Sequence, residues 1–209
     1  MIEAPDVDEE LPEWEAVGLG SGFELEDVLV SADLAGVSAA GGRIARCRLE
    51  RVSLAGARLR SLRLVDAILS DCDLSNADLT GAALSRVRFE RCRMTGLVGA
   101  GWEASQVVLR TCKLDLASFH QAQFRGAEFD GCVLDDADLA ASRLRETSFP
   151  GSRLVGVGID GARLAGVDFR GARLDPAGDV TALRGAVIDG LQLVELAPAL
   201  ARGLGIVVR

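Results

Sequence analysis

Residues 77–81 read ADLTG, residues 127–131 read AEFDG and residues 167–171 read VDFRG, and most of the chain keeps this five-residue cell. The frame runs unbroken from Leu29 to Leu174, and Leu, Ile, Phe or Met occupies 27 of its 30 central positions. The exceptions are Ala39, Gly99 and Ala104. Because a period of five fits neither an α-helix nor a flat strand, the backbone is expected to wind and to turn once in every cell.

A second position in each cell fixes the size of the coil. The residue two before each centre is small or β-branched in 26 of 30 cells, and all five cysteines stand there. The last four cysteines are spaced by twenty residues, so a coil of four cells would stack them on one side about 4.8 Å apart. A square coil also places four phenylalanines on another shared side, whereas a triangular coil explains neither set. The cysteines are Cys47, Cys72, Cys92, Cys112 and Cys132, and the phenylalanines are Phe89, Phe129, Phe149 and Phe169.

These cells resemble the A(D/N)LXX motif of the pentapeptide-repeat family over residues 27–176. The resemblance implies an all-β solenoid, a right-handed quadrilateral β-helix with one cell on each side. The central residue and the residue two before it would point inward. Glycine recurs at the corners, where a positive φ costs it nothing.

Residues 95–106 invert the sizes within the cell. Leu97 and Trp102 stand at the small position, and Gly99 and Ala104 stand at the large one. One interpretation is a loop that leaves the rod. The other, which we favour, is a continuous coil with swapped filling, because a loop of ten residues would take Cys72 and Cys92 out of line with the later cysteines.

The two ends fall outside the repeat. Residues 1–26 form an acidic segment, with residues 1–12 expected to be disordered and Trp14, Leu19 and Phe23 expected to cover the first coil. Residues 177–209 are predicted to form a cap with a short C-terminal α-helix that begins at Asp189, ends near Gly205 and is kinked or split by Pro198. Residues 206–208 could add a short strand. The family resemblance implies a homodimer through this segment, for which the candidate interface residues are Leu193, Leu196, Leu200 and Leu204.

Catalytic and metal chemistry find little support in the sequence. His120 is the only histidine and is predicted to lie on the surface, and the cysteine spacing contains no C-x-x-C. A filled rod has no substrate cavity, so we expect no enzyme activity, no cofactor and no metal. The acidic first thirty residues contain no apolar run, so neither a signal peptide nor a membrane span is expected, and inward-facing thiols favour a reducing compartment. The expected location is therefore the cytoplasm.

The net charge of −8 is unevenly placed. Residues 1–27 hold ten acidic and no basic residues, so the remainder carries 21 acidic and 23 basic residues, a net +2. On a square coil, one side gathers arginines around a single Glu103, and two adjoining sides, those of Leu74 and of Leu79, gather aspartates. The arginines are Arg43, Arg63, Arg125, Arg143, Arg145 and Arg163, and the candidate partner-binding aspartates are Asp73, Asp78, Asp115, Asp135, Asp136 and Asp138.

Two functions follow as hypotheses. The composition is similar to that of actinobacterial and fluoroquinolone-resistance members of the family, which implies a rod that mimics DNA, binds DNA gyrase or another type II topoisomerase, and modulates it or protects it from topoisomerase poisons. The alternative is a protein-interaction scaffold with another partner. Direct binding of nucleic acid is not expected, because no exposed aromatic residue is interleaved with the arginines.

Overall fold

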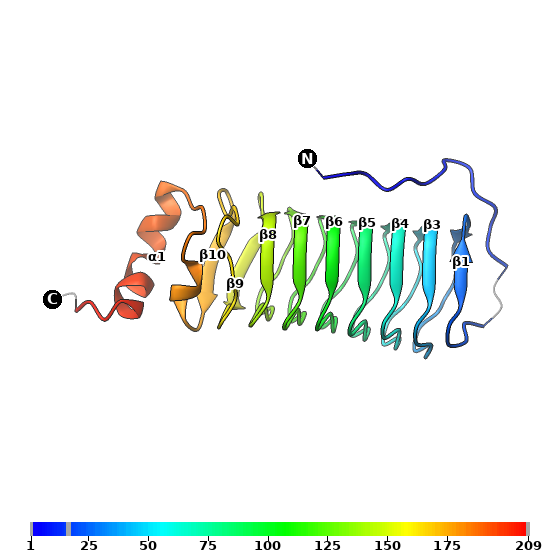
Figure 1. Cartoon of the computed structure of the whole chain (residues 1–209), viewed down its shortest axis with the longest axis horizontal. Coiled ribbons are helices and arrows are strands. Elements are labelled where there is room, and N and C mark those ends of the chain that lie inside the picture. Colours follow the sequence, from blue (N-terminus) through cyan, green and yellow to red (C-terminus); the bar gives the residue numbers. More distant parts are fainter. Residues whose placement is uncertain (1, 16–17, 208–209) are drawn as a thin grey trace.

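The computed structural model describes residues 2–15 and 18–207 and shows a straight rod of stacked coils with a helix at its C-terminal end (Figure 1). Almost all strands are parallel neighbours along the rod, in the order β1-β3-β4-β5-β6-β7-β8, with β2 beside β3 and a separate pair formed by β9 and β10. The strands are β1 (Glu24–Glu26), β2 (Leu29–Val30), β3 (Arg43–Glu50), β4 (Arg63–Ser70), β5 (Ala83–Glu90), β6 (Glu103–Arg110), β7 (Gln123–Asp130), β8 (Arg143–Ser148), β9 (Arg153–Gly158) and β10 (Arg173–Ala177).

Each coil contains twenty residues, as the cysteine spacing predicts. Leu64 is the Cα partner of Ile44 and of Leu84, and the same offset continues along the sheet. Together with four cells per coil, this register confirms the four-sided β-solenoid. We number the sides by their inward centres: face 1 holds Ile44, Leu64 and Leu84; face 2 holds Leu49, Leu69 and Phe89; face 3 holds Leu54, Leu74 and Met94; face 4 holds Leu59, Leu79 and Gly99.

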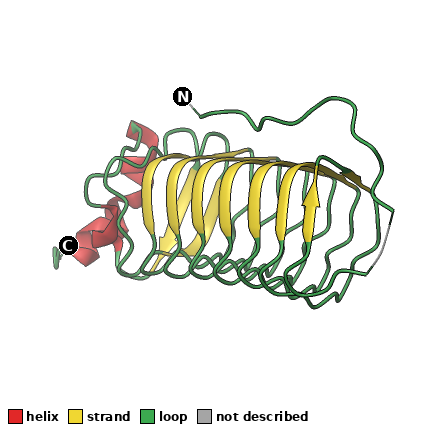
Figure 2. Ribbon diagram, turned by 45° about the vertical axis from the view of Figure 1, so that its right-hand side comes forward, coloured by secondary structure: helices red, strands yellow, loops and turns green. Residues whose placement is uncertain are grey.

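The corners follow the pentad. Every fifth residue from Gly36 to Gly171 has a positive φ, whether or not it is glycine. The corners that follow faces 3 and 4 are closed by bonds such as Ala77 N–H to Leu74 O (3.1 Å), which is the geometry of a type II turn. The corner between faces 1 and 2 only bends the chain, so one continuous strand covers both faces (Figure 2).

Side chains fill the interior completely. Cys72, Cys92, Cys112 and Cys132 are buried in one line at face 3, and each thiol lies within hydrogen-bonding distance of the carbonyl oxygen 23 residues earlier. Cys47 is also buried but lies on face 2, opposite Ala67. Phenylalanine rings stack at face 2, with centroids 4.8 Å apart for Phe129 and Phe149 and 5.1 Å apart for Phe149 and Phe169. Both predicted ladders are therefore present.

Residues 95–106 continue the coil rather than leaving it. Trp102 is fully buried, its indole N–H donates to Leu79 O (3.0 Å), and its ring meets Phe119 edge-on. Gly99 supplies the space, because a Cβ on it would lie 2.9 Å from both rings. The large Trp102 side chain at the small position thus fills the space that Gly99 leaves at the central position.

The N-terminal segment differs from the expected disorder. Residues 2–12, here called the arm, run in an extended path back along the outside of the rod (Figure 1). Glu3 N donates to Gln106 Oε1 and Asp6 N to Asp66 Oδ1, and Arg48 Nε donates to Asp8 O. Each of these bonds uses a backbone N–H or C=O group of the arm. Such attachment cannot be predicted from the amino-acid composition.

The rod is covered at both ends. Trp14, Leu19 and Phe23 pack against the first coil, and the Phe23 ring lies on Gly42, where a Cβ would collide with it. At the other end, a short 3₁₀ helix η1 (Val180–Leu183) precedes α1 (Gly190–Gly203), which begins with a capping box between Asp189 and Gln192.

The C-terminal cap departs from the sequence expectation in two details. Of the two predicted effects of Pro198, a kink or a split into two helices, the split does not occur, because Pro198 lies inside the single helix α1. Ile206 and Val207 form no strand, and Val208 lies outside the described residues.

Candidate interaction surfaces

The six predicted aspartates lie on both sides of the corner between faces 3 and 4, and we call them the aspartate ridge. The outward positions of face 3 and face 4 carry five of them, and Asp136 occupies the corner itself with φ 53°. Within each face, successive aspartates are separated along the rod by one to three coils. The structure therefore brings together the ridge that the sequence predicted: Asp73, Asp115 and Asp135 on face 3, Asp78 and Asp138 on face 4, and Asp136.

Three of the six ridge carboxylates, those of Asp73, Asp78 and Asp138, accept hydrogen bonds from their own turns. Asp73 accepts bonds from Ser75 N (2.9 Å) and its hydroxyl, and Asp78 accepts the equivalent bonds from Thr80. Partial burial acts to raise the pKa of both aspartates, yet the bonds from Ser75 and Thr80 outweigh it and the net pKa is lowered. These carboxylates are thus ionised and rigidly held at neutral pH.

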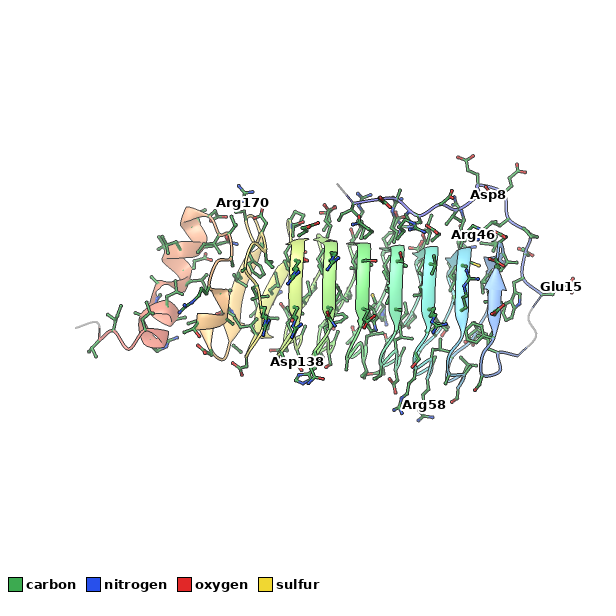
Figure 3. All side chains as sticks on the ribbon, in the orientation of Figure 1. Asp8, Glu15, Arg46, Arg58, Asp138 and Arg170 are labelled. Atoms are coloured by element: carbon green, nitrogen blue, oxygen red, sulfur yellow. The ribbon has the colours of Figure 1, made fainter. Side chains whose placement is uncertain are left out.

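Several ridge members are also paired. Asp78 forms an ion pair with Arg60 (2.6 Å) and Asp135 with Arg153 (2.9 Å). Asp138 lies 3.7 Å from the exposed His120, which confirms the surface position of that histidine (Figure 3). The arginine partners reduce the net negative charge of the ridge.

Face 1 carries the predicted arginines. A shallow hollow of about 660 Å³ lies along it, lined in part by Arg63, Arg125, Arg143 and Arg145, with Glu103 between them. Arg43 differs from the others because it pairs with Glu26 (3.3 Å). Face 1 is therefore basic mainly toward its C-terminal end.

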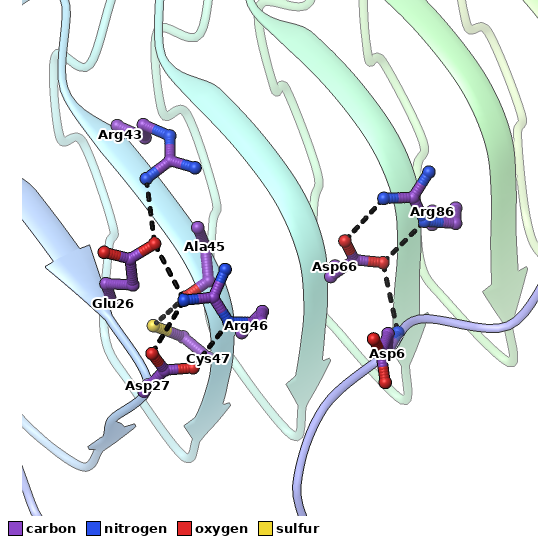
Figure 4. A network of polar contacts seen from close by, with 9 residues as sticks. All are labelled: Asp6, Glu26, Asp27, Arg43, Ala45, Arg46, Cys47, Asp66 and Arg86. Atoms are coloured by element: carbon purple, nitrogen blue, oxygen red, sulfur yellow. Dashed lines mark hydrogen bonds and ion pairs between the residues drawn. The ribbon is translucent and has the colours of Figure 1, made fainter.

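The corner between faces 1 and 2 holds two networks of hydrogen bonds and ion pairs, one around Arg46 and one around Arg86 (Figure 4). Arg46 donates to both oxygens of Asp27 at 2.7 Å and to Glu26 at 2.8 Å. Arg86 grips Asp66 with two bonds of 2.6 Å, and Asp66 also accepts from the arm through Asp6 N. The Arg86 bonds lower the pKa of Asp66, so this 6 % exposed carboxylate stays charged.

The arm presents its acidic side chains to solvent. Glu3, Asp6, Asp8, Glu9 and Glu10 are exposed, and within the described part of the chain none of them forms an ion pair. Charges on Glu3 and Asp6 nevertheless contribute to a raised pKa of Arg86. The arm was not singled out as a surface from the sequence, although its run of carboxylates was visible.

The described residues form no site for metal binding or for thiol chemistry. Among residues 2–15 and 18–207, no three His, Cys, Asp or Glu side chains are grouped to hold a metal ion. Contact with the neighbouring thiols and burial raise the pKa of Cys92 and of Cys112 to about 12, so these thiols remain protonated and unreactive. Within the same residues, no helix has the length and apolar character needed to cross a membrane.

The C-terminal helix separates the four predicted interface leucines. Leu196 is 2 % exposed and packs into the core, and Leu200 is partly buried against it. Leu193 and Leu204 remain exposed, as do Leu191 (80 %) and Val194 (73 %), which the sequence did not single out. Leu196 was placed on the interface because it falls on the apolar stripe, but that stripe is what covers the last coil.

Comparisons with known proteins agree with this architecture. Two family profiles match, described as pentapeptide repeat region over residues 43–119 and as pentapeptide repeats (8 copies) over residues 105–139 and 132–171. The protein belongs to the pentapeptide-repeat family. No curated protein matches the chain.

Solved structures with similar chains are distant. A trypsin-treated variant of QnrB1, described as a plasmid-mediated fluoroquinolone resistance protein, is 21 % identical, with 92 % of this chain and 94 % of that chain covered and a TM-score of 0.40. A pentapeptide repeat protein from the thylakoid lumen of Arabidopsis thaliana is 20 % identical, with 80 % and 75 % covered and a TM-score of 0.24. A cyanobacterial protein from Cyanothece 51142, Rfr23, is 19 % identical, with 68 % and 88 % covered and a TM-score of 0.20. Similarity at this level carries no inference about function.

Proposed function

We propose that this protein is a non-catalytic rod that binds DNA gyrase or another type II topoisomerase as a DNA mimic, and that it modulates the enzyme or protects it from topoisomerase poisons. The observation that supports the proposal is the aspartate ridge, a line of carboxylates of which turn hydrogen bonds hold Asp73, Asp78 and Asp138 in place. Fixed carboxylates along a straight rod can occupy a basic groove that otherwise holds phosphates, with an affinity that falls as salt rises.

A gyrase supercoiling assay with and without a fluoroquinolone tests the proposal. The wild-type protein at micromolar concentration should inhibit supercoiling or reduce drug-induced cleavage. The variant D135K/D136K/D138K should lose at least about tenfold in potency, because it reverses the charge at the C-terminal end of the ridge, where three of its six aspartates lie. The control E9K/E10K/E24K reverses three exposed carboxylates away from the ridge and should retain the effect.

Folding of both variants is checked by circular dichroism, because D135K also removes the ion pair with Arg153. Equal potency of the ridge and control variants would move the site elsewhere on the rod. A wild-type protein without any effect on the enzyme would remove the proposal.

The second candidate is a protein-interaction scaffold with a different partner. It is favoured by the mixed charge of the rod: residues after 27 carry a net +2, and Arg60 and Arg153 pair with ridge aspartates. A mimic of DNA would gain from unpaired carboxylates. The supercoiling assay separates the two candidates, because a scaffold for another partner leaves the enzyme unchanged.

The proposed working form is a homodimer through the C-terminal cap. Its support is the exposed apolar surface on and just beyond α1 that includes Leu191, Leu193, Val194 and Leu204. We also place the protein in the cytoplasm, on the argument that five unpaired cysteines are typical of a reducing compartment.

A further inference from the structure

Four arginines on face 1 form two pairs, and in each pair one arginine lies directly opposite the other in the neighbouring coil. Arg125 in β7 is the Cα partner of Arg145 in β8, and Arg143 is bridged to Arg163 in the following coil. All four side chains are exposed. We call these residues the arginine cluster.

Like charges at directly opposed positions of neighbouring strands destabilise a sheet. Elsewhere an acid often lies one coil away from an arginine, as in Asp66–Arg86 and Asp71–Arg91. Like charges are also opposed at Arg43–Arg63, Arg153–Arg173 and Arg93–Lys113, but each of these pairs has an acid beside it: Glu26 at Arg43, Asp135 at Arg153 and Asp73 near Arg93. No described residue forms an ion pair with any member of the arginine cluster, and the nearby Glu103 and Glu146 are likewise unpaired. The cluster therefore lowers the stability of the free protein, which is the pattern expected where a ligand supplies the missing charge.

The hollow on face 1 begins at this cluster. Its floor is open because Ala83 and Ser85 of β5 and Ser105 of β6 have small outward side chains, and the outward Glu103 of β6 also lines it. Arg63 stands at its other end. A volume of about 660 Å³ is enough for a small molecule.

The cluster is compact, which limits the ligand. Its four residues lie on three consecutive coils, so their backbones lie within about 10 Å along the rod axis at about 4.8 Å per coil. Guanidinium groups bind phosphate oxygens through two parallel hydrogen bonds. The only aromatic residue that lines the hollow, Phe124, is 2 % exposed, so a nucleobase has no ring on which to stack.

We propose that the arginine cluster is a binding site for a compact anion with two or more linked phosphate groups. The phosphates would lie between the paired guanidinium groups of Arg125–Arg145 and Arg143–Arg163 and supply the charge that the fold omits. The site is on face 1, away from the aspartate ridge, and is independent of any effect on a topoisomerase.

Thermal unfolding in magnesium-free pyrophosphate, against sodium chloride of equal ionic strength, tests the site. The wild-type midpoint should rise by at least about 2 °C in pyrophosphate, because a ligand that binds only the folded state stabilises it. R143Q/R145Q should melt higher than the wild type in chloride alone, since it removes stacked like charges, and it should lose the pyrophosphate response. In calorimetric titration its affinity for pyrophosphate should be at least about tenfold weaker.

R91Q is the matched control, because Arg91 is an exposed arginine that pairs with Asp71 (2.8 Å). It should melt slightly lower in chloride and keep the pyrophosphate response. The proposal is overturned if R143Q/R145Q melts lower than the wild type, if it retains the response, or if sulfate at equal ionic strength acts as strongly as pyrophosphate. It is also overturned if a short DNA duplex stabilises the protein through this cluster while pyrophosphate does not.

Discussion

At the scale of single residues, the interior is held by exchanges of volume between neighbours. Gly99 and Trp102 show this most clearly. Trp102 stands at a position that usually holds a small side chain, and its ring fills the space left free by glycine at the central position. Trp102 keeps its only polar group satisfied by donating to Leu79 O. The pair therefore behaves as one unit, and changing either member alone should be costly.

Gly99→Ala is the first test of this exchange. Its Cβ would lie 2.9 Å from Phe119 Cδ1 and from Trp102 Cε2, closer than packed atoms tolerate. Overpacking of this kind should lower the free energy of unfolding by about 1 to 3 kcal/mol in urea titration. The control Gly101→Ala has open space around its Cβ but a φ of +67°, so it should cost only about 1 kcal/mol. Equal effects of the two substitutions would contradict the volume argument.

Asp66 provides a second residue-scale prediction, on pH. Arg86 lowers the pKa of Asp66, so the carboxylate stabilises the fold at neutral pH, and this stabilisation is lost as the pH falls below about 4 through the folded-state pKa. Asp66→Asn should lower the unfolding free energy by about 1 to 2 kcal/mol at pH 7, since Arg86 is one-third exposed and keeps some contact with water. The difference between variant and wild type should shrink below pH 4. A difference that is constant from pH 7 to pH 3 would contradict this account.

At the scale of elements, the C-terminal cap continues the donor ladder of the rod. Cysteine thiols and then the Ser152 hydroxyl lie at the carbonyl oxygens 23 residues earlier. Ala172 has no donor, but one coil later the buried Gln192 of α1 donates to Phe169 O (2.6 Å) and to Ala172 O (2.7 Å). The helix is thus fixed to the last coil by a polar side chain as well as by Leu196.

Gln192→Ala should therefore loosen the cap. It removes the side-chain donor from Phe169 O, which keeps its bond from Ala172 N, and from Ala172 O, and it removes one half of the capping box, so the unfolding free energy should fall by about 1 to 3 kcal/mol. Glu195→Ala, an exposed position on the same helix, should change it by less than about 0.5 kcal/mol. Urea titration of both variants makes the comparison. A Gln192→Ala variant as stable as Glu195→Ala would show that the two bonds do not hold the helix.

The secondary-structure elements also show how much of the fold could be predicted from the sequence. The pentad and the twenty-residue cysteine spacing predict the coil, its register and both interior ladders, because each is a periodic pattern with one geometric solution. The start of α1 at Asp189 was predicted for the same kind of local reason. The inward face of α1 was predicted only in part, because Gln192 is polar and its role depends on carbonyls that lie 20 and 23 residues away.

At the scale of the whole molecule, the position of the arm along the rod could not be predicted from the sequence. Its bonds join residues 60 and 103 positions apart and involve backbone groups, which leave no compositional signal. Its consequence is electrostatic. The arm adds a strip of exposed carboxylates at the corner between faces 1 and 2, diagonally opposite the aspartate ridge, so the rod carries acidic surfaces on two opposed corners and a basic patch on face 1.

The last prediction concerns assembly through the exposed apolar surface of the cap. L193E/V194E places two charges in each copy at positions that are 53 % and 73 % exposed, so the monomer should fold normally while the dimer is disrupted. The apparent dimer dissociation constant in sedimentation equilibrium should rise at least about hundredfold, because the charges of both copies would be desolvated and placed against each other. Glu195→Gln is the control on the same helix and should leave the dimer intact. Substitution of Leu196 is not informative here, because that side chain packs into the core and its loss would disturb the cap itself. A wild-type protein that remains monomeric at tens of micromolar, or an L193E/V194E variant that still dimerises, would place any self-association on another face of the rod.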